Sequence, residues 1–206
     1  QGCVLAPLIF GFGSLVPYTN IDNYLKTKDN AIFGGYLDDC AIVANHEDAT
    51  TAFGMYKEEG SRHGLHINYG PNKTVVLLGK CNNAEETQRR ITAWTLEGIP
   101  LSNIKIHPDN AGEEDQYGYV HLGVPLGSNE YQYNHLHTLV DKYIESCKCD
   151  EIVQDIQAKW VYLLWVIRQK FPFWFRHMCP SITSSVEDKI EEHMRDKFDV
   201  ILGQPT

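Results

Sequence analysis

The chain has 206 residues, of which 43% are hydrophobic, enough for one substantial core or two small ones. Its formal charge of −9, from 18 basic and 27 acidic residues, argues against a protein that coats nucleic acid through charge alone, because such proteins are basic. No apolar run approaches the roughly 20 residues that span a bilayer, so no membrane contact is expected. Six scattered cysteines favour reduced thiols in an intracellular protein, with nucleus and cytoplasm both open.

Hydrophobic periodicity and turn residues predict a mixture of helices and short strands, and therefore an α+β fold. In chain order the expected elements are a helix over 5–16, a loop or frayed helix over 17–30, a hairpin over 31–44, an amphipathic helix over 48–63, strands over 65–68 and 74–78, a helix over 84–96, a strand within 99–106, a loop over 108–116, a hairpin over 117–126 and a helix over 131–147.

The last third of the chain is expected to be helical. The longest apolar run, Trp160 to Ile167, predicts a buried helix segment. Ser184 and Glu187 have the spacing of a capping box, which predicts that the final helix begins at Ser184 and runs towards Leu202.

The tip of the first predicted hairpin, Tyr36-Leu37-Asp38-Asp39, carries the clearest chemical signal. A turn presents two adjacent carboxylates at a fixed point that solvent can reach, and hard divalent cations bind carboxylate oxygens presented in this way. Two such ions, roughly 3.5–4 Å apart, can hold the attacking and leaving oxygens of a phosphoryl transfer. The alternative is a surface turn without chemistry, because Asp is common in turns.

Four blocks in order resemble those of reverse transcriptases. They are Gln1 to Phe10, Tyr36 to Asp39, Gly64 to Asn68 followed by Asn72-Lys73-Thr74, and His121 to Gly127. They are similar to the Gln-Gly block, the Tyr-x-Asp-Asp hairpin, the Gly-Leu-x-x-Asn…Lys-Thr block and the primer-grip block of that family. The segment from about Lys159 to Leu202 is more loosely similar to the thumb of non-LTR-retrotransposon enzymes.

This resemblance implies a partial polymerase palm over residues 1–128, an antiparallel sheet with packed helices, followed by a helical thumb or connection region over residues 129–206. It also implies an RNA-directed DNA polymerase, which extends a DNA primer on an RNA template by two-metal nucleotidyl transfer from deoxynucleoside triphosphates. The implied cofactor is Mg²⁺ or Mn²⁺, and the oligomeric state stays open.

The resemblance also implies roles for single residues. Asp38 would ligate both ions directly, and Asp39 would support it or ligate weakly. Lys73 would lie near the incoming triphosphate, where an ammonium can neutralise charge or donate a proton, although a loop lysine without a role is the alternative. The expected contacts to substrate, template and primer are Gln1, Gly2, Tyr36, His121, Leu122, Gly123, Lys159 and Arg168.

The sequence departs from the family in two ways. The family's earlier palm block carries another metal-binding Asp upstream of the position of Gln1, and Leu37 stands where non-LTR enzymes usually have Ala. We therefore expect a piece of a longer reading frame that binds metal weakly and has no polymerase activity alone. The alternatives are a non-enzymatic relic or domesticated nucleic-acid-binding domain of retroelement origin, and another metal-dependent phosphoryl-transfer enzyme, against which the third and fourth blocks argue.

Overall fold

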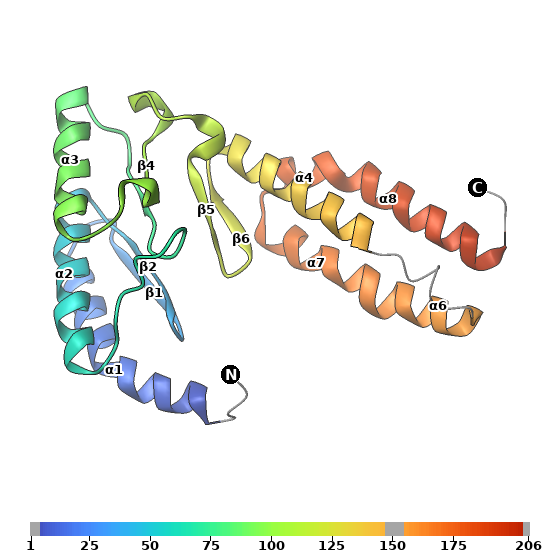
Figure 1. The fold of residues 1–206 in the computed structure, drawn as a ribbon, viewed down its shortest axis with the longest axis horizontal. Helices are drawn as coiled ribbons and strands as arrows, with labels where there is room; N and C mark the ends of the chain where they lie inside the picture. The colour runs from blue at the N-terminus through green and yellow to red at the C-terminus, as the bar shows by residue number, and fades with distance from the viewer. Residues whose placement is uncertain (1–4, 147–154, 204–206) are drawn as a thin grey trace. The chain divides into compact units, whose positions relative to one another are not determined.

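The computed structural model describes residues 5–146 and 155–203 and confirms the mixed α+β fold (Figure 1). Contacts divide the chain into two compact units, Gln1–Glu113 and Glu114–Thr206. The palm–thumb boundary implied at residue 128 therefore falls inside the second unit. The main elements of the first unit are α1 (Ala6–Leu25), β1 (Ile32–Tyr36), β2 (Asp39–Val43), α2 (His46–Arg62), β3 (Val76–Leu77), α3 (Ala84–Leu96) and β4 (Ile104–Lys105).

The first helix is longer than the apolar stretch that predicts it. α1 continues through a buried Pro17, whose ring would meet the carbonyl of Gly13 in a regular helix. The helix nevertheless extends because Ile21 and Leu25 are fully buried against α2. Of the two alternatives for residues 17–30, the loop is therefore wrong as far as Leu25, and helix is observed there.

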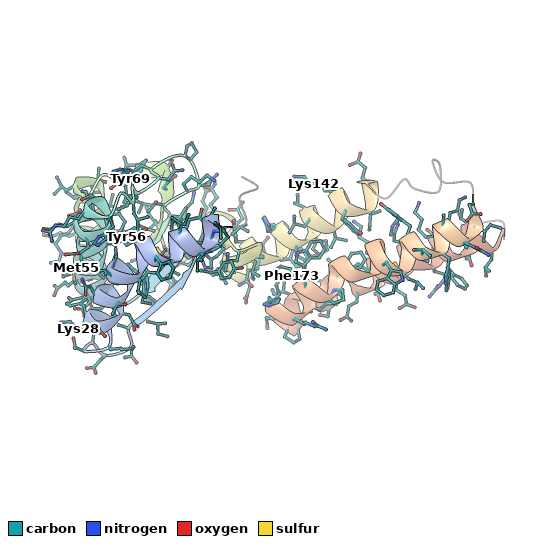
Figure 2. All side chains as sticks on the ribbon, turned by 90° about the horizontal axis from the view of Figure 1, so that it is seen from below. Lys28, Met55, Tyr56, Tyr69, Lys142 and Phe173 are labelled. Carbon is teal, nitrogen blue, oxygen red and sulfur yellow. The ribbon has the colours of Figure 1, made fainter. Side chains whose placement is uncertain are left out.

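The hairpin and the helix after it are confirmed. β1 and β2 pair antiparallel from Ile32↔Val43 to Tyr36↔Asp39. α2 begins after Asn45, whose side chain accepts a hydrogen bond from the backbone N–H of Asp48 at 2.9 Å. α1 and α2 pack against each other and against the hairpin, where Met55 and Tyr56 of α2 join the core (Figure 2).

The third helix is confirmed over its predicted range, but the two strands predicted around Pro71 are not a hairpin. Residues 65–68 form no strand, and β3 instead pairs in parallel with β4. The physical reason is that side chains form hydrogen bonds with backbone groups of this segment that a strand would pair. The Asn68 side-chain oxygen accepts from the N–H of Gly70 at 2.9 Å, and the Thr74 hydroxyl donates to the Asn68 carbonyl at 2.8 Å.

A second core of the first unit lies between α2, α3 and the β3–β4 pair. Phe53 and Trp94 meet edge to face there, with ring centroids 5.4 Å apart. Asn83 caps α3 by accepting from the N–H of Glu86 at 2.8 Å. This core fixes α3 and the loop before β3 in one body with α2.

The second unit holds a hairpin and a group of helices. Its main elements are β5 (Gly118–His121), β6 (Val124–Gly127), α4 (Asn129–Ser146), α6 (Ile156–Tyr162), a π-helical turn (Leu163–Ile167), α7 (Arg168–His177) and α8 (Pro180–Leu202). The predicted hairpin and the helical last third are thus confirmed. The core of this unit is formed by side chains of α4, α7, α8 and the π-helical turn, including Leu136, Val140, Leu163, Phe171, Ile182, Val186 and Ile190.

One prediction for the helices of the second unit is wrong, and another holds only in part. α8 begins at Pro180, not at Ser184, because a proline fits the first turn of a helix, where its missing N–H would have no partner. Ser184 lies inside the helix, and its hydroxyl donates to the Ser181 carbonyl at 3.3 Å. The apolar run after Trp160 is buried only in part: Leu163 is buried, whereas Trp165 is 72% exposed. The π-helical turn changes the 3.6-residue period on which that prediction depends.

None of the described helices combines the length and apolar character needed to cross a bilayer.

Candidate metal-binding hairpin and its surroundings

The two acidic residues lie at the end of the β1–β2 hairpin. Tyr36 and Asp39 are the last paired residues, so Leu37 and Asp38 form a two-residue turn. Both carboxylates are exposed. Leu37 has φ = 53°, in the left-handed region that a bulky residue rarely adopts and that costs about 1–2 kcal/mol. Contacts around the turn must therefore hold this conformation.

Tyr18 of α1 supplies such a contact. Its hydroxyl donates a hydrogen bond to the Leu37 carbonyl oxygen at 2.5 Å. Its ring packs edge to face with Phe33 of β1, with centroids 5.2 Å apart. A Cβ on Gly35 would lie 2.7 Å from the Tyr18 ring, so the absence of a side chain there makes room for the ring. The turn is thus anchored to α1.

The alternation of the strands separates two faces of the hairpin. Gly35 and Cys40 form one pair and lie on the face that packs on α1, whereas Tyr36 and Asp39 form the next pair and lie on the other face. Tyr36 is exposed. The structure therefore brings Tyr36, Asp38 and Asp39 together at one end of the hairpin, as the resemblance implies.

The groups beneath the turn are neutral at physiological pH. Burial, with a smaller contribution from Cys40, raises the pKa of Tyr18 well above its usual value. Burial, followed by the negative charge of Asp39, raises the pKa of the Cys40 thiol to about 11. Among the residues that the structure describes, neither Asp38 nor Asp39 forms an ion pair. In the described part of the chain, therefore, no cationic side chain is paired with either carboxylate.

The donor set fits a hard divalent cation. Mg²⁺ is usually bound by one or two carboxylates together with waters and substrate phosphates, and Asp38 and Asp39 offer carboxylate oxygens on adjacent residues. Within residues 5–146 and 155–203, no group of three or more His, Cys, Asp or Glu side chains could hold a metal ion. A two-ion centre at this hairpin would therefore need oxygen ligands from the substrate or from another segment.

Lys73 lies in the same unit, on an ordered loop. Asn103, which is 1% exposed, donates to the carbonyls of Gly70 and Thr74 at 2.9 and 3.1 Å and accepts from the N–H of Asn72 at 3.2 Å. The exposed Lys73 sits between these fixed points. Lys73 makes no ion pair with Asp38 or Asp39 in the described part of the chain, so the structure orders this loop without joining it to the carboxylates.

The second hairpin holds three of the predicted contacts. Leu122 and Gly123 form its turn with φ values of 49° and 82°, the positive pair that two-residue hairpin turns require. His121 ends β5, with its ring 6.0 Å from that of Tyr119. Gly123 lies against Phe173 of α7, where an added Cβ would be 3.6 Å from the ring (Figure 2). His121, Leu122 and Gly123 are thus together, in the second unit.

The remaining predicted residues lie further along the chain or outside the described part. Lys159 is half-buried on α6, and Arg168 is the first residue of α7. Gln1 and Gly2 lie outside the described residues.

Sequence reasoning missed Tyr18 and Asn103, the two side chains that order the turn and the Lys73 loop. Tyr18 falls in the range for which a loop was the alternative, and its partner is a backbone carbonyl 19 residues away. Asn103 bonds backbone groups about 30 residues earlier. In the sequence, the residues Asn68, Gly70 and Asn72 indicate a turn near these partners but do not indicate Asn103 itself.

Comparison of the chain with family models, with curated proteins and with solved structures finds no match.

Proposed function

We propose that this chain is part of the palm and thumb of a reverse transcriptase, an RNA-directed DNA polymerase of the retrotransposon type. The observation that carries the proposal is the Asp38–Asp39 pair at the end of a hairpin, in a turn that Tyr18 holds in a left-handed conformation. Strained backbone that the surroundings maintain is typical of functional sites. The four sequence blocks support the same reaction.

The proposed reaction joins a deoxynucleotide to a primer. The primer 3′-hydroxyl oxygen attacks the α-phosphorus of the triphosphate, the bond to the bridging oxygen breaks, and pyrophosphate leaves. Bound Mg²⁺ or Mn²⁺ supplies the positive charge that lowers the pKa of the hydroxyl and stabilises the leaving group. Asp38 would hold the ions and Asp39 would support it, because the two residues are adjacent at the end of the hairpin.

Other side chains orient the substrates. Tyr36 lies on the same face as Asp39 and contacts the sugar at the primer terminus. Lys73, an exposed cation on a loop that Asn103 orders, binds the triphosphate. The backbone of the second hairpin around Leu122 holds the primer, and Lys159 binds backbone phosphate.

A second candidate is a non-enzymatic nucleic-acid-binding domain of retroelement origin. One observation favours it: the described residues offer two adjacent carboxylates rather than a cluster of three or more metal-ligating side chains. In that case the hairpin would keep its fold but would have no partner carboxylate with which to complete a two-ion centre.

Primer extension on an RNA template tests the proposal. The 206-residue chain is compared with a longer version that carries the natural sequence upstream of Gln1, each with and without Mg²⁺. We expect Mg²⁺-dependent extension by the longer version, its loss in the Asp38→Ala variant, and none by the shorter chain. A folded longer version that extends no primer would contradict the polymerase and favour the second candidate.

A further inference from the structure

We propose that Tyr18 is a positioning residue for the metal site: its hydroxyl, bonded to the Leu37 carbonyl, sets the orientation of the peptide that carries Asp38. This inference rests on the proposed function, because it assigns Tyr18 a part in metal binding at the same hairpin. Tyr18 lies on α1, eighteen or more residues before the acidic turn, and belongs to none of the sequence blocks that suggest the reaction.

Peptide geometry connects the hydrogen bond to the carboxylate. The carbonyl of Leu37 and the N and Cα atoms of Asp38 lie in one rigid peptide plane. A hydrogen bond of 2.5 Å from Tyr18 to this carbonyl oxygen therefore fixes the plane from which the Asp38 side chain departs. A two-residue hairpin turn favours positive φ, but this region costs a bulky residue such as Leu37 about 1–2 kcal/mol, so a contact to its carbonyl helps to hold the plane.

The hydroxyl is itself held in place by the packing of its ring. The ring contacts Phe33 at 5.2 Å and Tyr56 at 6.1 Å between centroids, and it fills the space left by the missing side chain of Gly35. Burial raises the pKa of Tyr18, so the hydroxyl keeps its proton and remains a donor at physiological pH. These contacts form a chain from the core of the first unit to the acidic turn.

A matched control exists on the same helix. Tyr24, also on α1, donates its hydroxyl to the Asp48 carboxylate of α2 at 2.9 Å and does not touch the turn. Tyr18→Phe and Tyr24→Phe each remove one hydroxyl from α1 and leave a ring that can pack. A merely structural role for Tyr18 predicts similar effects of the two substitutions, whereas a positioning role predicts that only Tyr18→Phe weakens metal binding.

The test is a Mn²⁺ titration of the whole chain, followed through the paramagnetic broadening of the backbone amide signals of residues 36–40. Broadening that is lost in Asp38→Ala defines binding at the hairpin. Loss of a hydrogen bond made directly to a metal ligand commonly costs 10- to 100-fold in affinity, and Tyr18 acts one peptide removed from Asp38, so the lower end applies. We therefore expect Tyr18→Phe to weaken hairpin binding by about tenfold, while Tyr24→Phe retains the affinity of the unaltered chain.

The outcomes separate this inference from the proposed function. If the unaltered chain shows no broadening at the hairpin that depends on Asp38, the metal site itself is refuted. If such binding is present and Tyr18→Phe leaves it unchanged, or if Tyr24→Phe weakens it equally, the positioning role is refuted. Should Tyr18→Phe fail to fold by circular dichroism, Gly35→Ala replaces it, because the added Cβ would lie 2.7 Å from the Tyr18 ring and so displace the hydroxyl from the Leu37 carbonyl. This variant is expected to weaken hairpin binding, and unchanged affinity there overturns the inference.

Discussion

Replacing Asn103 by alanine tests how the loop that carries Lys73 is held. Asn103 is 1% exposed and has three hydrogen bonds, two donated to the carbonyls of Gly70 and Thr74 and one accepted from the N–H of Asn72. Asn103→Ala removes all three and leaves the backbone groups of the loop with no replacement partner. The loop should then lose its order, although the cores of the unit are untouched.

The magnitude follows from the geometry. A buried hydrogen bond contributes about 0.5–1.5 kcal/mol net, and a buried group left without a partner costs about 1–3 kcal/mol. Because Gly70 and Thr74 are half-buried, water can reach part of the loop, and we take about 1 kcal/mol for each bond. The free energy of unfolding of the first unit should therefore fall by about 3 kcal/mol.

Urea unfolding followed by fluorescence measures this change. Trp94 is the sole tryptophan of the first unit and is buried, so it reports on that unit when the tryptophans at 160, 165 and 174 are replaced by phenylalanine. Asn82→Ala is the control, because Asn82 is exposed and its amide donates to Glu86 at 3.0 Å. A loss for Asn103→Ala that stays within about 1 kcal/mol of the control would refute the reasoning.

Three further predictions concern packing and charge. Gly35→Ala should destabilise the first unit by about 1–3 kcal/mol, because the added Cβ would lie 2.7 Å from the Tyr18 ring. Gly34→Ala, with open space around the added Cβ, should not destabilise it. Urea denaturation of the two variants measures the difference. Burial, then the charges of two nearby arginines, lowers the pKa of His46 below 6.5. The stabilising effect of the neutral imidazole is therefore present above pH 6.5 and is lost as the pH falls through the pKa of the folded state. Between pH 7 and 5 the His46→Gln variant should lose less stability than the unaltered chain, and equal losses would contradict this. Leu136→Ala, at a fully buried site, should cost the second unit about 2–5 kcal/mol by thermal unfolding, and a smaller loss would show that the site can collapse.

Much of the fold could be predicted from the sequence because its signals are local. The two hairpins follow from apolar runs around polar tips, and α2 follows from the helical spacing of its apolar residues. α1 was underestimated because Pro17 is a local signal for a break, whereas the burial of Ile21 and Leu25 is a tertiary effect. Tertiary packing therefore sets the length of α1.

The segment between α2 and α3 shows a different limit. Its apolar residues suggested two neighbouring strands, but the backbone bonds of residues 68–74 go to side chains, including that of a distant Asn103. Such side-chain bonds compete with strand pairing and leave no periodic pattern. β3 therefore pairs with β4, which lies almost thirty residues later.

The hairpin that carries the candidate ligands could be predicted from the sequence, but the contacts that support it could not. Asp38 and Asp39 are recognisable because their neighbours in sequence form the hairpin that presents them. Tyr18 and Gly35 are recognisable only once α1 is seen to pack on that hairpin, since their contact joins residues 17 positions apart. Candidate ligands can be proposed from a sequence pattern, whereas the contacts that orient them depend on the tertiary fold.

The most direct test of the proposed function compares Asp38→Asn with Asp39→Asn in primer extension, using an RNA template, Mg²⁺ and the version extended upstream of Gln1. Each substitution keeps the size of the side chain and removes its charge. We expect Asp38→Asn to lower the rate by about a hundredfold or more, a loss of several kcal/mol of transition-state stabilisation. Asp39→Asn should retain measurable extension. Extension that is unaffected by Asp38→Asn would contradict the assignment of this hairpin to the metal site.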